Sequence, residues 1–184
     1  MSMFLFTGAQ STGKTTLLRH IVSEYPENTL VTNVVRDLKE NSGITINKQG
    51  NYNSQQIIFN TLENKLEAID NNIILGDRGL IDVVAFTKYL YTQNVVSEYE
   101  YHTQLKCLED WHLKHQNDCT YMYTPIEFPV VSDGVRDVDE CYREYIDETI
   151  HELLELSNIE YHIITGTVSD RLDKVRNIIN SKIL

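Results

Sequence analysis

The chain has 184 residues, of which 41% are hydrophobic and 23% are charged, and its formal net charge is −11. This length suffices for one domain with a substantial core, and the negative charge disfavours a broad surface for nucleic acid. The sequence has no apolar run near the roughly 20 residues of a membrane span, no signal-peptide pattern and no zinc or redox cysteine spacing. We expect a cytoplasmic protein without a membrane partner, folded as a single domain over residues 1–184.

An apolar strand at residues 3–7 leads into a glycine-rich loop at residues 8–16, which reads G-A-Q-S-T-G-K-T-T. This is a complete G-x-x-x-x-G-K-[ST] phosphate-binding loop, whose backbone N–H groups and following helix bind phosphate oxygens. Lys14 is expected to bridge the β- and γ-phosphates of ATP, and the Thr15 hydroxyl to hold Mg²⁺. The predicted nucleotide-binding residues are Gly8, Gln10, Ser11, Thr12, Gly13, Lys14, Thr15 and Thr16.

Strand and helix patterns alternate along the rest of the chain. Further strands are expected at residues 29–33, 73–77, 120–124 and 161–165. Helices are expected from near Lys14 to residue 25 and at residues 55–69, 80–91, 99–115, 140–156 and 169–183, with a polar loop at residues 40–53. This alternation predicts an α/β fold with three layers, α/β/α, around a central, mostly parallel sheet.

Asp77 and Arg78 follow the apolar strand at residues 73–77. A carboxylate at the carboxyl end of such a strand lies beside the Mg²⁺ and the phosphate loop, so Asp77 is predicted to bind the metal or to act as general base. Arg78 is placed to clamp an acceptor phosphate or ribose, or to orient Asp77. The alternative is a salt bridge at the end of the strand.

The segment from Ser132 to Asp137 contains Gly134 and Arg136 between a strand and an acidic helix. An arginine on such a flap can close over the transferred phosphoryl group, so Arg136 is predicted to be catalytic on an arginine-bearing lid. The alternative is an ordinary loop entering a helix, with a cap at Asp137 or Asp139.

Arg36 and Asp37 follow the second predicted strand, at the same edge of the sheet as the phosphate loop. Arg36 is a candidate for binding the acceptor, and Asp37 competes with Asp77 for the role of base. Both could instead belong to the solvated start of a helix.

Together these motifs resemble the P-loop kinase group that includes the ribosylnicotinamide kinase domain of NAD-biosynthesis regulators, commonly classed as a small AAA-like domain. The resemblance rests on residues 8–16, 35–37, 55–56, 77–78 with Asp82, 133–136 and 161–179. It implies one P-loop kinase domain that transfers the γ-phosphoryl group of ATP, with Mg²⁺, to a small nucleoside-like acceptor. The Asp77-Arg78 pair is similar to the Asp-Arg of deoxynucleoside and thymidylate kinases.

One position departs from the ribosylnicotinamide kinases, which have an acidic residue where this chain has Asn33. The acceptor therefore stays open among nucleosides, nucleotides and nucleoside-like molecules. Two alternatives remain, a kinase acting on a hydroxymethylated pyrimidine in DNA and a regulatory P-loop ATPase without a small-molecule acceptor. The sequence also leaves a homo-oligomeric assembly open.

Overall fold

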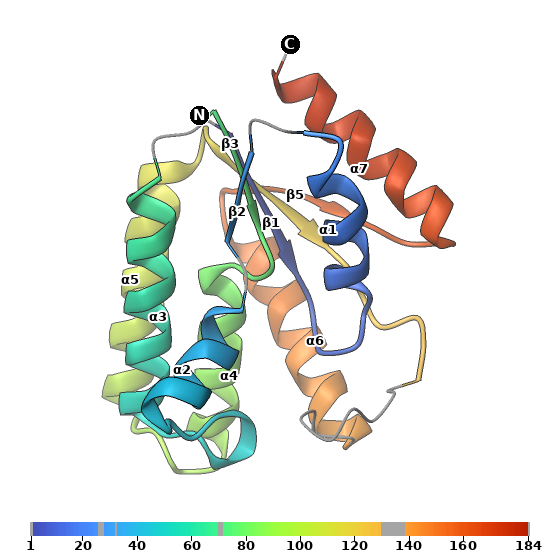
Figure 1. The fold of residues 1–184 in the computed structure, drawn as a ribbon. Helices are drawn as coiled ribbons and strands as arrows, with labels where there is room; N and C mark the ends of the chain where they lie inside the picture. Colours follow the sequence, from blue (N-terminus) through green and yellow to red (C-terminus); the bar gives the residue numbers. More distant parts are fainter. Residues whose placement is uncertain (1, 26–27, 32, 70–71, 130–138, 184) are drawn as a thin grey trace.

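Five parallel strands form the sheet at the centre of the fold (Figure 1). The structure is a computed structural model that describes residues 2–25, 28–31, 33–69, 72–129 and 139–183. The strands are β1 (Ser2–Thr7), β2 (Asn28–Val31), β3 (Ile73–Gly76), β4 (Cys119–Tyr123) and β5 (Glu160–Ile163). The α-helices are α1 (Lys14–Val22), α2 (Val34–Ser42), α3 (Tyr52–Glu67), α4 (Leu80–Thr92), α5 (Glu98–His115), α6 (Glu140–Leu156) and α7 (Val168–Ile183).

The strand order is β2-β3-β1-β4-β5, which places β1 at the centre. Phe4 of β1 lies opposite Leu75 of β3 on one side and Thr120 of β4 on the other. Because all strands run in the same direction, their carboxyl ends share one edge of the sheet. The phosphate loop after β1 and Asp77 after β3 therefore lie at the same edge, as expected for a ligand site in a parallel sheet.

Alternate residues of β1 pack on opposite faces of the sheet, as the two-residue period of a strand requires. Met3 and Leu5 belong to the core cluster formed with α3, α4, α5 and α6, whereas Phe4 and Phe6 belong to the cluster formed with α1 and α7. Figure 1 shows α1 and α7 together on one side of the sheet and α3, α4 and α5 on the other. The predicted three-layer α/β/α fold is confirmed, and all strand pairs in the described residues are parallel.

The segment between β2 and α3 differs from its prediction. The polar loop expected at residues 40–53 is wrong in part, because α2 extends to Ser42, a 3₁₀ turn spans Asn47–Gln49 and α3 already begins at Tyr52. Helix α2 was hard to recognise because Val34 is its one buried residue. It ends at Gly43, whose positive φ of 61° suits glycine.

The helices within the described ranges include none that is both long enough and apolar enough to cross a bilayer.

Candidate nucleotide-binding site

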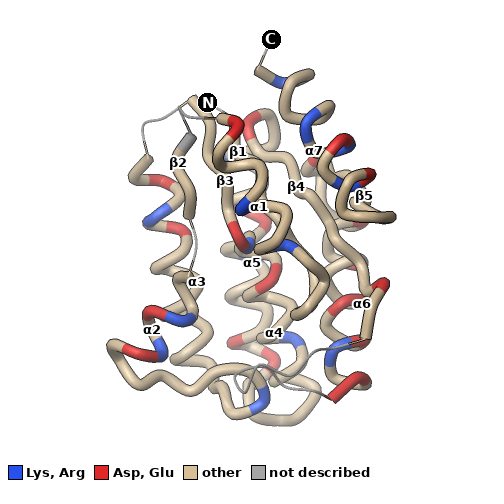
Figure 2. Tube along the Cα trace, turned by 45° about the vertical axis from the view of Figure 1, so that its right-hand side comes forward, with Lys and Arg blue, Asp and Glu red and all other residues tan. Residues whose placement is uncertain are grey.

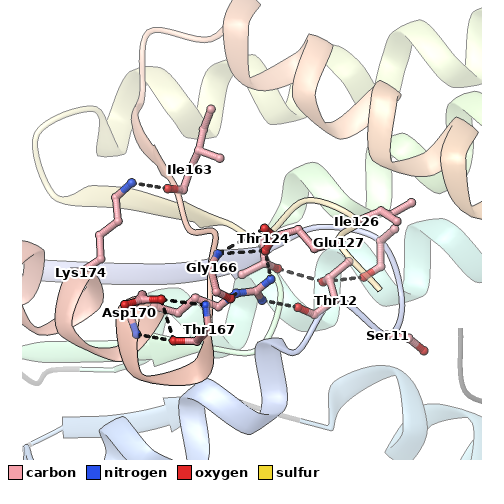
Figure 3. Close-up of polar contacts among 12 residues, drawn as sticks. Ser11, Thr12, Thr124, Ile126, Glu127, Ile163, Gly166, Thr167, Asp170 and Lys174 are labelled. Carbon is pink, nitrogen blue, oxygen red and sulfur yellow. Dashed lines mark hydrogen bonds and ion pairs between the residues drawn. The ribbon is translucent and has the colours of Figure 1, made fainter. Parts of the chain in front are cut away.

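The phosphate loop joins β1 to α1, and its curved path depends on two glycines. Gly8 has a φ of 138°, and a Cβ there would lie 2.3 Å from the carbonyl oxygen of Thr124. Gly13, at the N-cap of α1, has a φ of 95°. The Thr12 hydroxyl lies 2.9 Å from the hydroxyl of Thr124, which joins the loop to the end of β4 (Figure 3). Any other residue at Gly8 would therefore open the junction between loop and sheet.

The Lys14 side chain folds back over its own loop. Its Nζ donates to the carbonyl oxygens of Gly8 (2.8 Å) and Ala9 (2.6 Å) and to the hydroxyl of Thr12 (3.2 Å). Burial and, next in size, the positive charge of Arg78 lower the pKa of Lys14 to about 8. The ammonium group is thus held at the loop by neutral acceptors, and an anionic phosphate would compete with them for it.

The lowered pKa of Lys14 predicts a pH dependence of ATP binding. Phosphate binding requires the charged form of Lys14, and in the free protein this form decreases as the pH rises above about 8. At high pH, binding of ATP should therefore be accompanied by uptake of a proton. The affinity for ATP should be about tenfold lower at pH 9 than at pH 7. Calorimetry at both pH values measures this difference. A Lys14→Ala protein should bind weakly with little change between them, and an equally steep loss in that variant would contradict the assignment.

Asp77 and Thr15 meet beside the loop. The Thr15 hydroxyl donates to Oδ2 of Asp77 at 2.9 Å, and the Asp77 backbone N–H donates to the carbonyl of Val31 at 2.9 Å, which fixes the carboxylate at the end of β3. A hydroxyl and a carboxylate are hard oxygen ligands of the kind that Mg²⁺ prefers. Among the described residues no group of three or more His, Cys, Asp or Glu side chains could hold a metal. This pair could therefore supply two oxygen ligands to a Mg²⁺ ion.

Asp82 lies buried behind this pair, with 0% of its surface exposed. Its carboxylate accepts from the backbone N–H of Gly79 at 2.8 Å, which caps α4, and from that of Gly8 at 3.3 Å. Burial raises the pKa of the Asp82 carboxyl against the opposing charges of Arg78 and Lys14. Asp82 thus ties the start of the phosphate loop to the segment after β3.

Two buried arginines hold the phosphate loop from behind. Arg143 on α6 donates from Nε to the carbonyl of Gln10 at 2.9 Å, and Arg171 on α7 donates to the carbonyl of Thr12 at 2.8 Å. Arg171 also donates to the carbonyl of Gly166 at 3.0 Å and pairs with Glu127. Figure 3 shows Thr12, Glu127 and Gly166 gathered around this network. These bonds fix the loop carbonyls of Gln10 and Thr12 against α6 and α7.

A cavity of about 940 Å³ opens from the phosphate loop toward α2 and α3. Its lining contains the predicted nucleotide-binding residues from Gln10 to Thr16, together with Asp77, Arg78 and Arg36. Asp37, on the same helix as Arg36, is exposed and is not among the described lining residues. The predicted lid residue Arg136 lies outside the described residues.

The comparisons with known proteins agree with this arrangement. A family model described as an AAA domain matches residues 3–171. The chain belongs to this AAA domain family. No curated protein sequence matches the chain.

Solved structures similar to this AAA domain include two kinases and the NadR protein. Deoxyadenosine kinase from M. mycoides, with dCMP and dCDP bound, has a TM-score of 0.67 at 16% identity, and the match covers 98% of this chain and 100% of that one. Thymidylate kinase from Candida albicans has a TM-score of 0.66 at 14% identity, covering 100% and 93%. The NadR protein in complex with NR has a TM-score of 0.67 at 14% identity, covering 100% and 50%. The resemblance stated from the sequence is confirmed at the level of family and fold.

The sequence motifs of this AAA domain did not reveal Arg143 and Arg171. Each is separated from its partner in the loop by more than 130 positions. A signal was nevertheless present in helical periodicity. Arg143 lies three and seven residues before the buried Ile146 and Ile150, and Arg171 lies four and eight before the buried Val175 and Ile179. A charged residue on an apolar helix face predicts a buried, paired side chain.

Proposed function

We propose that the chain is a Mg²⁺- and ATP-dependent kinase that transfers the γ-phosphoryl group to a nucleoside, a nucleotide or a nucleoside-like acceptor. The observation that carries this proposal is the continuity of the cavity. It begins at the phosphate loop and extends to the side chains of α2, α3 and α4, including Arg36, Ile58 and Val83. A triphosphate at the loop and an acceptor against these helices would therefore share one chamber.

Each charged group at the loop has a role in this proposal. Lys14 neutralises charge on the β- and γ-phosphates, and Thr15 and Asp77 hold the Mg²⁺, which supplies charge neutralisation and orientation of the phosphates when bound. Arg78 binds the acceptor, and Arg36 approaches it from α2. Arg136 is proposed to close over the transferred group, while Asp37 and Asp77 stay the two candidates for a base.

The similar kinases support the coarser part of this proposal, phosphoryl transfer to a small molecule of the nucleoside or nucleotide class. A regulatory ATPase needs a positioned water rather than an acceptor chamber, and a DNA acceptor would have to approach a chain of net charge −11. Both are therefore treated as outcomes of the test.

The test measures release of ADP from ATP with Mg²⁺. Acceptor pools contain deoxynucleosides with their 5′-monophosphates, nicotinamide riboside, or a DNA duplex with 5-hydroxymethylpyrimidines. ADP release should require a small-molecule pool, and the product should carry the γ-phosphoryl group of radiolabelled ATP. ADP release that yields inorganic phosphate at the same rate without any acceptor would establish an ATPase instead. Transfer to the duplex alone would establish a DNA kinase.

A further inference from the structure

The described residues that line the cavity carry more positive than negative charges, although the whole chain is negative. The whole sequence has 16 Lys and Arg residues against 27 Asp and Glu residues. Around the cavity the described cations are Lys14, Arg19, Arg36, Lys39 and Arg78. The described carboxylates in the lining are only two, Asp77 and Glu40. Figure 2 shows acidic residues spread over most helices, so this concentration of cations is local. A cationic chamber on an acidic protein selects a strongly anionic occupant.

Several of these cations lie outside the phosphate loop. Arg36 and Lys39 are three positions apart on α2, so they lie on the same face of that helix. Arg78 follows β3 and lines the same cavity, and its guanidinium group lies 5.4 Å from the centre of the Phe86 ring. Its charge also lowers the pKa of Lys14, which places it near the loop. These three residues form a second cationic group beyond the one that binds the donor.

Among the described residues, the carboxylates near these cations are engaged by other groups or lie on the exposed surface of α2. A hydroxyl acceptor needs a base within hydrogen-bond reach. Asp82 is fully buried and accepts from two backbone N–H groups, and Asp77 accepts from the Thr15 hydroxyl beside the predicted Mg²⁺. Asn33, which follows β2 and lines the cavity, has an amide that cannot take up a proton. Glu40 lies on exposed α2 beside Lys39.

Beyond these cations the cavity becomes apolar. Ile58, Val83 and Val35 line both the main cavity and a small pocket that continues from it. The amide side chains of Asn47 and Gln55, which can form hydrogen bonds, also line this small pocket. Arg78 lines both spaces, so it lies where they join. An apolar end with few amides and a cationic entrance matches a nucleobase joined to a phosphate.

We propose that the acceptor is a nucleoside monophosphate and the product a nucleoside diphosphate, an inference that rests on the proposed kinase function. A non-bridging oxygen of the acceptor phosphate forms the new bond to the γ-phosphorus. The bond from this phosphorus to the β–γ bridging oxygen breaks, and ADP leaves with the electron pair. The acceptor phosphate is already a dianion near pH 7, so no proton has to be removed. Arg78, Arg36 and Lys39 offset the repulsion between the two anions.

The experiment compares each deoxynucleoside with its own 5′-monophosphate in the presence of Mg²⁺ and ATP, by separating the labelled products. At least one monophosphate should react with a kcat/KM about 100-fold or more above that of its nucleoside, which a few charge-assisted contacts supply. A nucleoside that reacts better than its monophosphate would overturn this inference while leaving the kinase function intact. Failure of both would overturn this inference, and failure of nicotinamide riboside as well, with ADP still released, would remove the proposed function too.

Two variants of Arg78 test whether this residue distinguishes the monophosphate from the nucleoside. Arg78→Gln should lower kcat/KM for the monophosphate by about 100-fold and kcat/KM for the nucleoside by a much smaller factor, and Arg78→Lys should restore part of the loss for the monophosphate. Lys106→Gln, at an exposed position of α5 that pairs with Asp110, is the matched control and should change neither. If Arg78→Gln lowers both reactions equally, Arg78 does not read the acceptor phosphate and the inference fails.

Discussion

Replacing Lys14 with alanine should abolish phosphoryl transfer, with a loss of about 100-fold or more in kcat, or roughly 3 kcal/mol of transition-state stabilisation. The ammonium group already donates to two carbonyls and a hydroxyl of the loop, so it is positioned within bonding distance of a phosphate bound there. Its charge opposes the negative charge that shifts toward the bridging oxygen as the bond to the γ-phosphorus breaks. Steady-state kinetics with the acceptor found in the transfer assay measures the loss.

Two controls separate this effect from unfolding. Lys14 is only 7% exposed, but Lys14 and its acceptor Thr12 line the cavity, so water can replace the lost donor and the melting temperature should change little. Lys106→Ala removes a lysine from the exposed face of α5 and should leave kcat unchanged. A Lys14→Ala protein with near-normal turnover would show that this loop does not carry the reaction.

Replacing Asp77 with asparagine should give the second large effect, a fall of about 100-fold in kcat/KM together with a higher requirement for Mg²⁺. Asparagine keeps the shape and can still accept from Thr15, whose hydroxyl lies 2.9 Å from the carboxylate, but it lacks the negative charge that attracts a divalent cation. Mg²⁺ titration of the initial rate at fixed ATP gives the shift in half-saturation.

Thr15→Val, which removes the other proposed oxygen ligand, should shift the Mg²⁺ requirement in the same direction. Asp173→Asn is the matched control, because Asp173 pairs with Arg176 at an exposed position of α7. An unchanged Mg²⁺ dependence in both Asp77→Asn and Thr15→Val would mean that the metal is held elsewhere.

The sequence was most informative where local pattern and chemistry coincide. The phosphate loop needs two glycines and a lysine at fixed spacing, so it is readable without any tertiary information, and the carboxylate at the end of β3 follows from the parallel sheet. The strand and helix alternation likewise predicted the layers correctly. The start of helix α2 at Arg36 and Asp37 was one of two alternatives, and its extent was not predicted because a helix with one buried residue has almost no apolar period to detect.

The contacts that shape the loop could not be predicted in the same way. Asp82 was noticed only as part of a resemblance, and its bond to the Gly8 N–H spans 74 positions. Arg143 and Arg171 reach the loop from α6 and α7, and their partners are backbone carbonyls, which carry no sequence signature. Such contacts depend on how helices pack across the sheet, which residue spacing alone does not specify.

Arg143 and Arg171 couple the packing of α6 and α7 to the binding of a triphosphate at the loop. Their guanidinium groups are buried and reach the loop from α6 and α7, so these contacts depend on how both helices pack. Thermodynamic reciprocity then applies: whatever free energy this packing contributes to triphosphate affinity, the bound triphosphate returns to the packing. The carboxyl-terminal third of the chain, which contributes no residue to the phosphate loop, thereby shares in the energetics of occupying it.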